Sequence, residues 1–294
     1  MKSLFPFYSI GHFINQPNSK TEFEITLFEE MEEPDVDDLH KHTFYEILWV
    51  DEGKSRQTID YQSYDLGTES LFFISPGQLH EFEAWQGLKG GTIMFTAEFF
   101  LLNQQNTDKL FELSFLDNYY TTPQLQLSTA SFKDIRKTID WLLQEKQRKD
   151  TNPAILQSLL HVLLLQAQRT IDTNTSTTTS KNYIIIYKKF KSLIEKHFHK
   201  GLTASDYATQ LHLSQHHLNL AVKQVTGKTA TEVIRARAIL EAKRLLTFTD
   251  LSVSEIAAEL GYFDSSYFAK IFKKESGLSP KAFRNQMSEK YRNQ

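Results

Sequence analysis

Four side chains in the first third of the chain have the types and spacing of a metal site. His40, His42 and Glu46 follow one another as His-x-His-x3-Glu, and His80 ends the later stretch PGQLH. On a β-strand, positions 40, 42 and 46 would face one side, and a neighbouring strand would bring His80 to them. Three imidazoles and a carboxylate suit a divalent metal such as Fe, Mn, Ni or Zn. The alternative is that these residues are structural or contact an organic effector.

A second set of side chains, in the last third of the chain, suits DNA. Helices predicted at 215–226 and 265–276 each combine an apolar face with a face of short, hydrogen-bonding or cationic side chains, which the major groove accepts. The apolar anchors would be Leu218, Ala221, Val222 and Val225 in the first helix and Phe268, Ile271 and Phe272 in the second. The DNA-facing candidates are Gln215, His216, Asn219 and Lys223 in the first helix and Ser265, Ser266, Lys270 and Lys273 in the second.

These two helices belong to a unit that occurs twice, at about 203–227 and 252–277. Each copy reads as a short helix, a tight turn and a longer helix, which is the helix-turn-helix pattern. Gly261 suits the sharp turn of the second copy, and Gly227 and Gly277 suit left-handed helix ends. The copies are joined by an amphipathic helix over 229–248, ~27 Å long at 1.5 Å per residue. A rigid spacer of that length would place two reading helices about one DNA turn, ~34 Å, apart.

The balance of charged residues differs between the two parts of the chain, with the change at about residue 181. Residues 1–181 hold 15 Lys and Arg against 26 Asp and Glu, whereas residues 182–294 hold 18 against 10. The stretch DTNTSTTTSK, 172–181, is small and polar and predicts a linker. The sequence thus predicts an acidic domain over 1–171 and a basic domain over 182–294 that meets a polyanion.

The acidic domain has two parts. Residues 21–100 alternate short β-rich runs (FEITLF, YEILWV, SRQTIDY, SLFFISP and GGTIMF) with Gly, Pro and Asp, which predicts a small antiparallel barrel or sandwich. Apolar residues at helical spacing over 132–143 and 155–164 predict a helical hairpin. The second of these helices is apolar over a broad arc, so it either seals the flank of the barrel or forms half of a dimer interface. The predicted fold class is α+β.

Residues 252–284, SVSEIAAELGYFDSSYFAKIFKKESGLSPKAFR, resemble the signature of the AraC/XylS family of bacterial transcription regulators. The resemblance implies that the second helices of both motifs read bases of double-stranded promoter DNA. It also implies a homodimer that contacts RNA polymerase and activates transcription. The first copy departs from the pattern, because His212 stands where the second copy has Gly261, and Leu220 occupies a position suited to a polar reader.

The histidine motif is similar to that of the cupin barrel, although its second half is partial, with Ser75 at a position where cupin enzymes place Pro. Sensor domains of AraC-type regulators resemble the same barrel and bind a small organic effector. We therefore expect an effector-responsive regulator that is not an enzyme and needs no cofactor. One alternative is a metal-dependent cupin enzyme carrying a DNA-binding domain, and another is a regulator without any effector.

Composition and hydropathy exclude several other classes of protein. The chain has no cysteine, so it can form neither disulfides nor thiolate metal sites. No run approaches the ~18 apolar residues of a membrane span, and the N-terminus lacks the pattern of a signal peptide. A cytoplasmic protein that does not enter membranes is expected.

Overall fold

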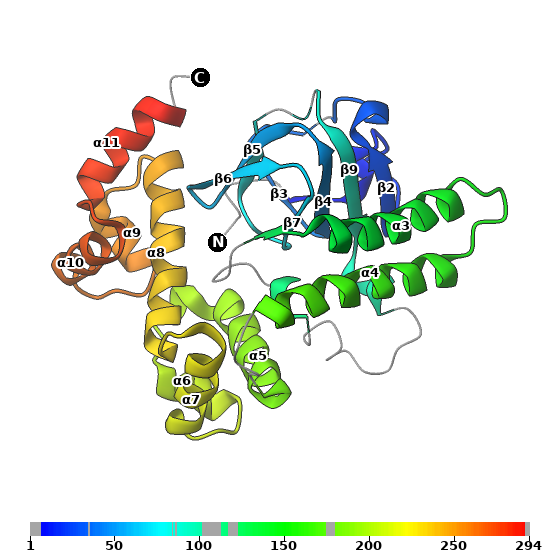
Figure 1. Ribbon diagram of the computed structural model, residues 1–294. Coiled ribbons are helices and arrows are strands. Elements are labelled where there is room, and N and C mark those ends of the chain that lie inside the picture. The colour runs from blue at the N-terminus through cyan, green and yellow to red at the C-terminus, as the bar shows by residue number, and fades with distance from the viewer. Residues whose placement is uncertain are drawn as a thin grey trace. The chain divides into compact units, whose positions relative to one another are not determined.

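The computed structural model describes residues 7–34, 36–83, 85, 87–101, 113–116, 123–174 and 180–291. The chain forms two compact units, residues 3–178 and 179–294. The first combines strands with two long helices and the second is helical (Figure 1). The predicted α+β class is therefore confirmed. Of the predicted linker 172–181, residues 172–174 and 181 are helical and 175–179 lie outside the described residues.

The N-terminal unit contains more strands than the sequence pattern indicated. They are β1 (Phe7–Tyr8), β2 (Phe23–Leu27), β3 (Lys41–His42), β4 (Tyr45–Glu52), β5 (Lys54–Ile59), β6 (Gln62–Gly67), β7 (Ser70–Ile74), β8 (His80–Phe82), β9 (Lys89–Phe95) and β10 (Gln124–Gln126). Five strands lie in the order β10-β7-β4-β9-β2, three in the order β6-β5-β8, and β1 pairs with β3. All these pairs are antiparallel except β1 with β3.

The central strand β4 sends alternate side chains into two separate cores. Ile47 and Trp49 are fully buried in the core that the five-stranded sheet shares with the helical hairpin. Leu48 and Val50 point to the opposite face, where they meet residues of the three-stranded sheet such as Ile59. This alternation is the one that a β-strand imposes on successive side chains. Because both faces of β4 are covered, it holds the elements around it in fixed positions.

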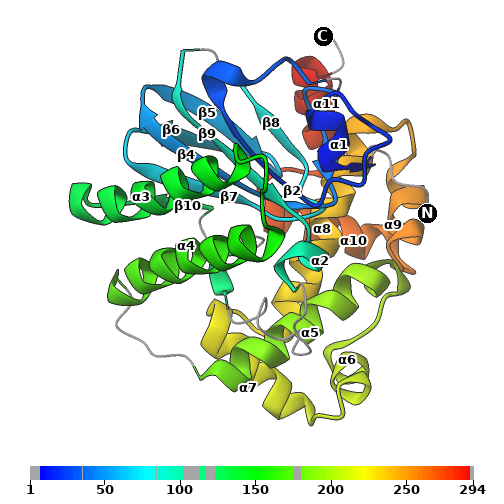
Figure 2. The same ribbon diagram turned by 90° about the vertical axis from the view of Figure 1, so that its right-hand side faces the viewer.

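The predicted helical hairpin consists of α3 (Thr129–Lys146) and α4 (Pro153–Asn174). Both helices lie along the outer face of the five-stranded sheet (Figure 2). The Ser128 side chain caps α3 by accepting a hydrogen bond from the Ser131 amide. Short elements complete the unit: α1 (Ile10–Phe13), η1 (Phe28–Glu30), α2 (Ala97–Phe100) and η3 (Ser114–Leu116).

α4 is apolar on two sides. Leu160, Leu163 and Leu164 are fully buried in the core under the hairpin. Ile155, Val162 and Leu165 are 45%, 43% and 60% exposed, and Trp141 of α3 is 54% exposed. Of the two roles predicted for this helix, the sealing of the barrel flank is therefore present, and an apolar outer face remains besides.

The C-terminal unit contains the predicted helices at 215–226, 229–248 and 265–276, with bounds shifted by at most one residue, together with further helices. They are α5 (Lys181–His197), η4 (Phe198–Lys200), α6 (Ala204–Gln210), α7 (Gln215–Thr226), α8 (Ala230–Phe248), α9 (Val253–Glu259), α10 (Ser265–Ser276) and α11 (Pro280–Tyr291). In Figure 1, α8 runs as a rod, with α6 and α7 near one end and α9 and α10 farther along it. Capping boxes at Thr229 with Glu232 and at Ser252 with Glu255 start α8 and α9.

A buried ion-pair network fixes α8 to α5. Arg237 lies over the Phe198 ring, and its Nε donates to the Glu195 carboxylate at 2.8 Å. Arg237 Nη1 also donates to Glu241 at 3.1 Å, and the two residues lie one helical turn apart on α8. Arg244 is only 1% exposed and donates to the same Glu241. This side chain is therefore buried within the ion-pair network and is not available to the phosphates of DNA.

Candidate effector pocket and DNA-reading helices

The structure brings together the four chemistry-bearing side chains of the N-terminal unit. His42 Nε2 lies 3.5 Å and His80 Nε2 lies 3.9 Å from Glu46 Oε2. The rings of His40 and His80 meet edge to face, with centroids 4.3 Å apart. Backbone hydrogen bonds between residues 40 and 80, both 3.0 Å, align the two segments. All four residues are at least nine-tenths buried.

The residues from His40 to Glu46 do not form the continuous strand that was expected. β3 ends at His42 and β4 begins at Tyr45, so the chain bends at Thr43 and Phe44. The Phe44 ring is fully buried and stacks on the His42 imidazole with centroids 4.0 Å apart. This stacking holds the histidine against Glu46 even though the strand is interrupted.

Two of the imidazoles have their protons placed by backbone carbonyls. His40 Nδ1 lies 2.7 Å from the Asp37 carbonyl oxygen, and His80 Nδ1 lies 3.1 Å from that of Gln78. Because a carbonyl only accepts, each Nδ1 carries the proton and donates it. Burial lowers the pKa of His40, and burial lowers the pKa of His80 well below its usual value, with neighbouring histidines adding to both shifts. Both rings are therefore neutral near pH 7, with the Nε2 lone pair available.

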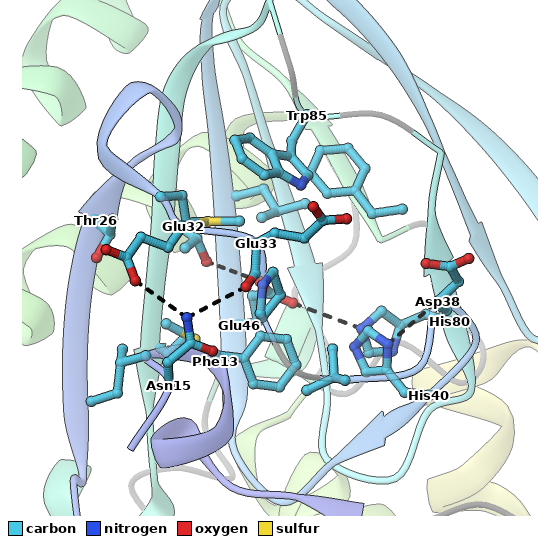
Figure 3. A pocket seen from close by; sticks show the side chains of 18 of the residues that line it. Phe13, Asn15, Thr26, Glu32, Glu33, Asp38, His40, Glu46, His80 and Trp85 are labelled. Carbon is cyan, nitrogen blue, oxygen red and sulfur yellow. Dashed lines mark hydrogen bonds and ion pairs between the residues drawn. The ribbon is translucent and has the colours of Figure 1, made fainter. Parts of the chain in front are cut away.

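These side chains border a cavity of about 440 Å³ inside the unit. His40, His80 and Glu46 line it from one side, and Asn15 and Glu32 line it from another (Figure 3). Glu46 Oε1 accepts a hydrogen bond of 3.0 Å from Thr92 of β9, which fixes the carboxylate. Apolar side chains make up much of the remaining wall: Phe13, Met31, Leu48, Phe82, Trp85 and Met94. A volume of this size is usual for sites that bind small molecules.

A divalent metal also fits some of these residues. His42, Glu46 and His80 each offer one ligand atom, and these atoms lie within 4.8 Å of one another. His80 donates its other ring proton to a backbone carbonyl, as metal-bound histidines commonly do. Neither ring nitrogen of His42 has a hydrogen-bond partner among the described residues. The cluster can therefore bind either a metal ion or a group of an organic ligand.

In the C-terminal unit the two reading helices are held as predicted. Leu218, Ala221 and Val222 are fully buried under α7, and Val225 is half-buried. Phe268 and Phe272 are fully buried under α10, with Ile271 at 8% exposure. Ser214 and Asp264 cap the two helices. The candidate readers that the structure leaves exposed are Gln215, His216, Lys223, Ser266, Lys270 and Lys273.

The other two candidate readers, Ser265 and Asn219, are less exposed. Ser265 is half-buried at the start of α10. Asn219 is half-buried, and its Oδ1 accepts a hydrogen bond of 3.0 Å from the Ala230 amide at the start of α8. Asn219 therefore ties the reading helix to the spacer helix. This role depends on a contact 11 residues away, which helical spacing within α7 did not reveal.

Two exposed aromatic residues beside α10 were not among the sequence candidates. Tyr267 is 51% exposed on the helix, and Phe263 is fully exposed in the turn before it. The signal was present in the sequence, because Tyr267 precedes the buried Phe268 and so points away from the apolar face.

The helix ends confirm the predicted glycine roles. Gly227 and Gly277 have φ of +72° and +80°, the left-handed conformation expected after α7 and α10. Gly261 has φ +76° in the turn of the second copy. His212 takes the same left-handed conformation in the first copy, at φ +56°. The departure from Gly at that position therefore alters the side chain and leaves the turn intact.

Comparisons with known proteins match both units of the chain. Residues 23–164 match the family described as AraC-like ligand binding domain, and residues 207–286 match a family described as Helix-turn-helix domain. The chain belongs to the AraC family of transcription regulators. It is a DNA-binding regulator, and the family does not consist of enzymes. The prediction that the chain is not an enzyme is thereby confirmed, and the metal-dependent cupin enzyme is set aside.

Individual relatives cover most of the chain. The HTH-type transcriptional regulator YfiF of Bacillus subtilis is 28% identical over 258 residues, which are 84% of this chain and 78% of that protein. The transcriptional activator RhaS of Pectobacterium carotovorum is 26% identical, over 84% of this chain and 87% of that protein. The structure of ToxT from Vibrio cholerae is 13% identical, with a TM-score of 0.40, over 90% of this chain and 98% of that chain. Within the described residues, no helix is both long and apolar enough to span a membrane.

Proposed function

We propose that this regulator is a transcription activator controlled by a small molecule that binds in the cavity of its N-terminal unit. The observation that carries the proposal is the cavity of about 440 Å³, bordered by His40, Glu46 and His80, in the unit that matches a ligand-binding family. Activation is proposed because relatives such as RhaS are named activators. Promoter DNA and RNA polymerase are then its partners, which places its work in the cytoplasm.

DNA recognition is proposed for the exposed faces of α7 and α10. The cationic side chains of Lys223, Lys270 and Lys273 are exposed, as are the hydrogen-bonding groups of Gln215, His216 and Ser266. Ser265 and Asn219 stay in the proposed set, with Asn219 also linked to α8. Lysines meet phosphate or base acceptors, whereas short polar side chains allow the helix to enter the groove.

A homodimer through the helical hairpin is proposed from its outer apolar face. Ile155, Val162 and Leu165 recur at helical spacing on α4, with Trp141 on α3. Such exposed apolar stripes are typical of protein interfaces. Leu165→Glu should convert a dimer into a monomer in sedimentation experiments, while Ile184→Glu on α5 serves as a control outside the hairpin. A wild-type monomer at micromolar concentration would exclude this part of the proposal.

The proposal is tested by selecting genomic DNA fragments that bind the purified full-length chain at fixed salt concentration. We expect a motif of two short blocks about one helical turn apart. The genes beside the recovered sites then indicate which metabolites to add. If the folded protein enriches no sequence, the activator proposal fails.

A metal ion is the second candidate effector, favoured by the three ligand atoms of His42, Glu46 and His80. Metal analysis after purification without chelator tests it directly. Less than about one-tenth equivalent of tightly bound transition metal counts against this candidate.

A further inference from the structure

We propose that the cavity of the N-terminal unit binds a small organic amine through its protonated nitrogen. This inference rests on the proposed function, since it names the chemical class of the effector. It follows from the hydrogen-bonding character of the cavity wall, which offers acceptors where a ligand would be anchored.

Four buried residues in the wall of the cavity, His40, Gln57, His80 and Glu46, carry hydrogen-bond acceptors. His40 Nε2 and Gln57 Oε1 have no hydrogen-bond partner among the described residues, and these side chains are 7% and 1% exposed. His80 Nε2 is a lone pair, because its Nδ1 donates to the Gln78 carbonyl. Buried polar atoms are rarely left unpaired, so a ligand that donates hydrogen bonds is expected here.

The fourth acceptor, Glu46, contributes charge as well. Its Oε1 accepts one hydrogen bond, from Thr92, and its Oε2 faces the Nε2 atoms of His42 and His80. His42 stands behind the carboxylate, outside the cavity lining, and makes no hydrogen bond to it. A buried carboxylate is costly without a charged partner, and Thr92 supplies only a neutral donor. An ammonium group supplies three donors and a positive charge at once.

The mouth of the cavity has the same sign of charge. Glu30, Glu32, Glu33, Asp37 and Asp38 line it together with Glu46, whereas none of the described lining residues is Lys or Arg. In Figure 3, Glu32, Glu33 and Asp38 lie around the cavity; these three are exposed, whereas Glu46 is buried. Carboxylates of one sign along a cavity attract cations and repel anions. A carboxylate, phosphate or sulfate ligand is therefore excluded by charge.

The apolar part of the wall favours an organic cation over a bare metal ion. Phe82, Trp85 and Met94 line the cavity with other apolar side chains, and the cavity volume of about 440 Å³ far exceeds what one ion fills. An aliphatic or aromatic body would cover these side chains, and an aromatic face also attracts an ammonium group. A ligand with an amine group and an apolar body would therefore contact both the acidic and the apolar parts of the cavity wall.

Thermal unfolding of the full-length chain near neutral pH tests the inference with matched probes at about 5 mM, a level at which a ligand of ~50 μM Kd adds clear stability. The three sets are butylamine, butanol and butyrate; putrescine, butanediol and succinate; and phenethylamine, phenethyl alcohol and phenylacetate. We expect at least one amine to raise Tm, while its alcohol and carboxylate counterparts do not. Stabilisation by a carboxylate or alcohol instead, or by no amine in the panel, overturns the inference.

Two variants and one control locate the effect. Glu46→Gln keeps the shape of the side chain and should weaken binding of the active amine about tenfold or more, because a charge-assisted contact is lost. Glu33→Gln, at the exposed mouth, is safe for folding and should weaken binding about twofold to threefold at low salt. Glu52→Gln removes an exposed carboxylate that pairs with Lys89 outside the cavity lining, and should leave binding unchanged. Equal amine affinity in wild type and Glu46→Gln contradicts the proposed anchor.

Failure of this inference is distinguishable from failure of the proposed function. Zinc, nickel and manganese salts are tested in parallel, and stabilisation by a metal alone assigns the site to metal and overturns the amine. A chain that selects a DNA motif but is not stabilised by any amine remains a regulator, with an effector of a different class. A chain that binds an amine but selects no DNA loses the proposed function and keeps the cavity chemistry.

Discussion

Gly201 and Gly261 meet backbone against backbone and join the two halves of the DNA-binding unit. A Cβ on Gly261 would lie 2.5 Å from the Gly201 nitrogen, and a Cβ on Gly201 would lie 2.7 Å from the Gly261 carbonyl oxygen. Both residues have positive φ, at +64° and +76°. The first precedes α6 and the second follows α9, so the segments that open one helix-turn-helix motif and turn the other are in contact.

Replacing Gly261 with Ala should therefore destabilise the chain more than the same change at Gly277. Both positions carry the left-handed strain, about 1 kcal/mol, but a Cβ on Gly277 meets no described atom within 4 Å. Urea unfolding of the two variants separates backbone strain from the clash. Equal losses of unfolding free energy would show that the Gly201 segment moves aside freely.

Phe272→Ala should lower the free energy of unfolding by about 3–5 kcal/mol, because the side chain is fully buried. Tyr267→Ala on the same helix is the control. Tyr267 is half exposed, and its loss should cost about 0.5 kcal/mol or less. If Phe272→Ala lost DNA binding while remaining as stable as wild type, the anchor role would be wrong.

Lys270→Ala should weaken binding to the selected operator by about 1–3 kcal/mol without a change in stability, if the side chain meets a base. Binding is measured on the operator and on random DNA at several salt concentrations. Equal losses on both would assign Lys270 to phosphate. Asn219→Ala is expected to lose operator binding and also about 1 kcal/mol of stability, because the Ala230 amide loses its acceptor.

Arg237→Met should destabilise the C-terminal unit by about 3 kcal/mol, since Glu195 and Glu241 would lose the charge between them. Adding Glu195→Gln and Glu241→Gln to this variant should restore part of that loss. A single variant as stable as wild type would mean that the network contributes nothing net. Chemical denaturation measures all of these.

Stability should fall as pH decreases below about 6.5, because His40 and His80 are neutral in the folded protein. Their folded-state pKa values lie below the ordinary value, so the unfolded chain binds more protons in that window and the free energy of unfolding rises with pH. Each histidine contributes a slope of up to about 1.4 kcal/mol per pH unit. His80→Gln should flatten the dependence. An unchanged slope in that variant would contradict a neutral buried His80.

The C-terminal unit was predictable because its signals are local. Capping residues, glycines and apolar spacing lie within the helices that they define, and so α7 and α10 emerged with their observed bounds. The occurrence of a second helix-turn-helix copy also supported the assignment of the first. By contrast, the burial of Arg244 and the bond from Asn219 to Ala230 depend on how helices pack, which no window of sequence shows.

The N-terminal unit was predictable in class and only partly in detail. In β4, Leu48 lies on one side and Ile47 and Trp49 lie on the other, as the alternation of a strand predicts. Short strands such as β3 and β8 have too few residues for a periodic signal. The carbonyls that set the tautomers of His40 and His80 come from Asp37 and Gln78, which are close in sequence but carry no motif.

The rod-like α8 has a consequence for the regulatory regions of the genome. It is one uninterrupted helix of 19 residues, capped at Thr229 and fixed to α5 through Arg237. Two reading heads on such a rod cannot follow half-sites that move apart, because inserting about five base pairs turns the second block to the opposite side of the duplex. If α7 and α10 both read DNA as proposed, operators of this regulator can drift in base sequence over evolution, while insertions and deletions between their two blocks are eliminated.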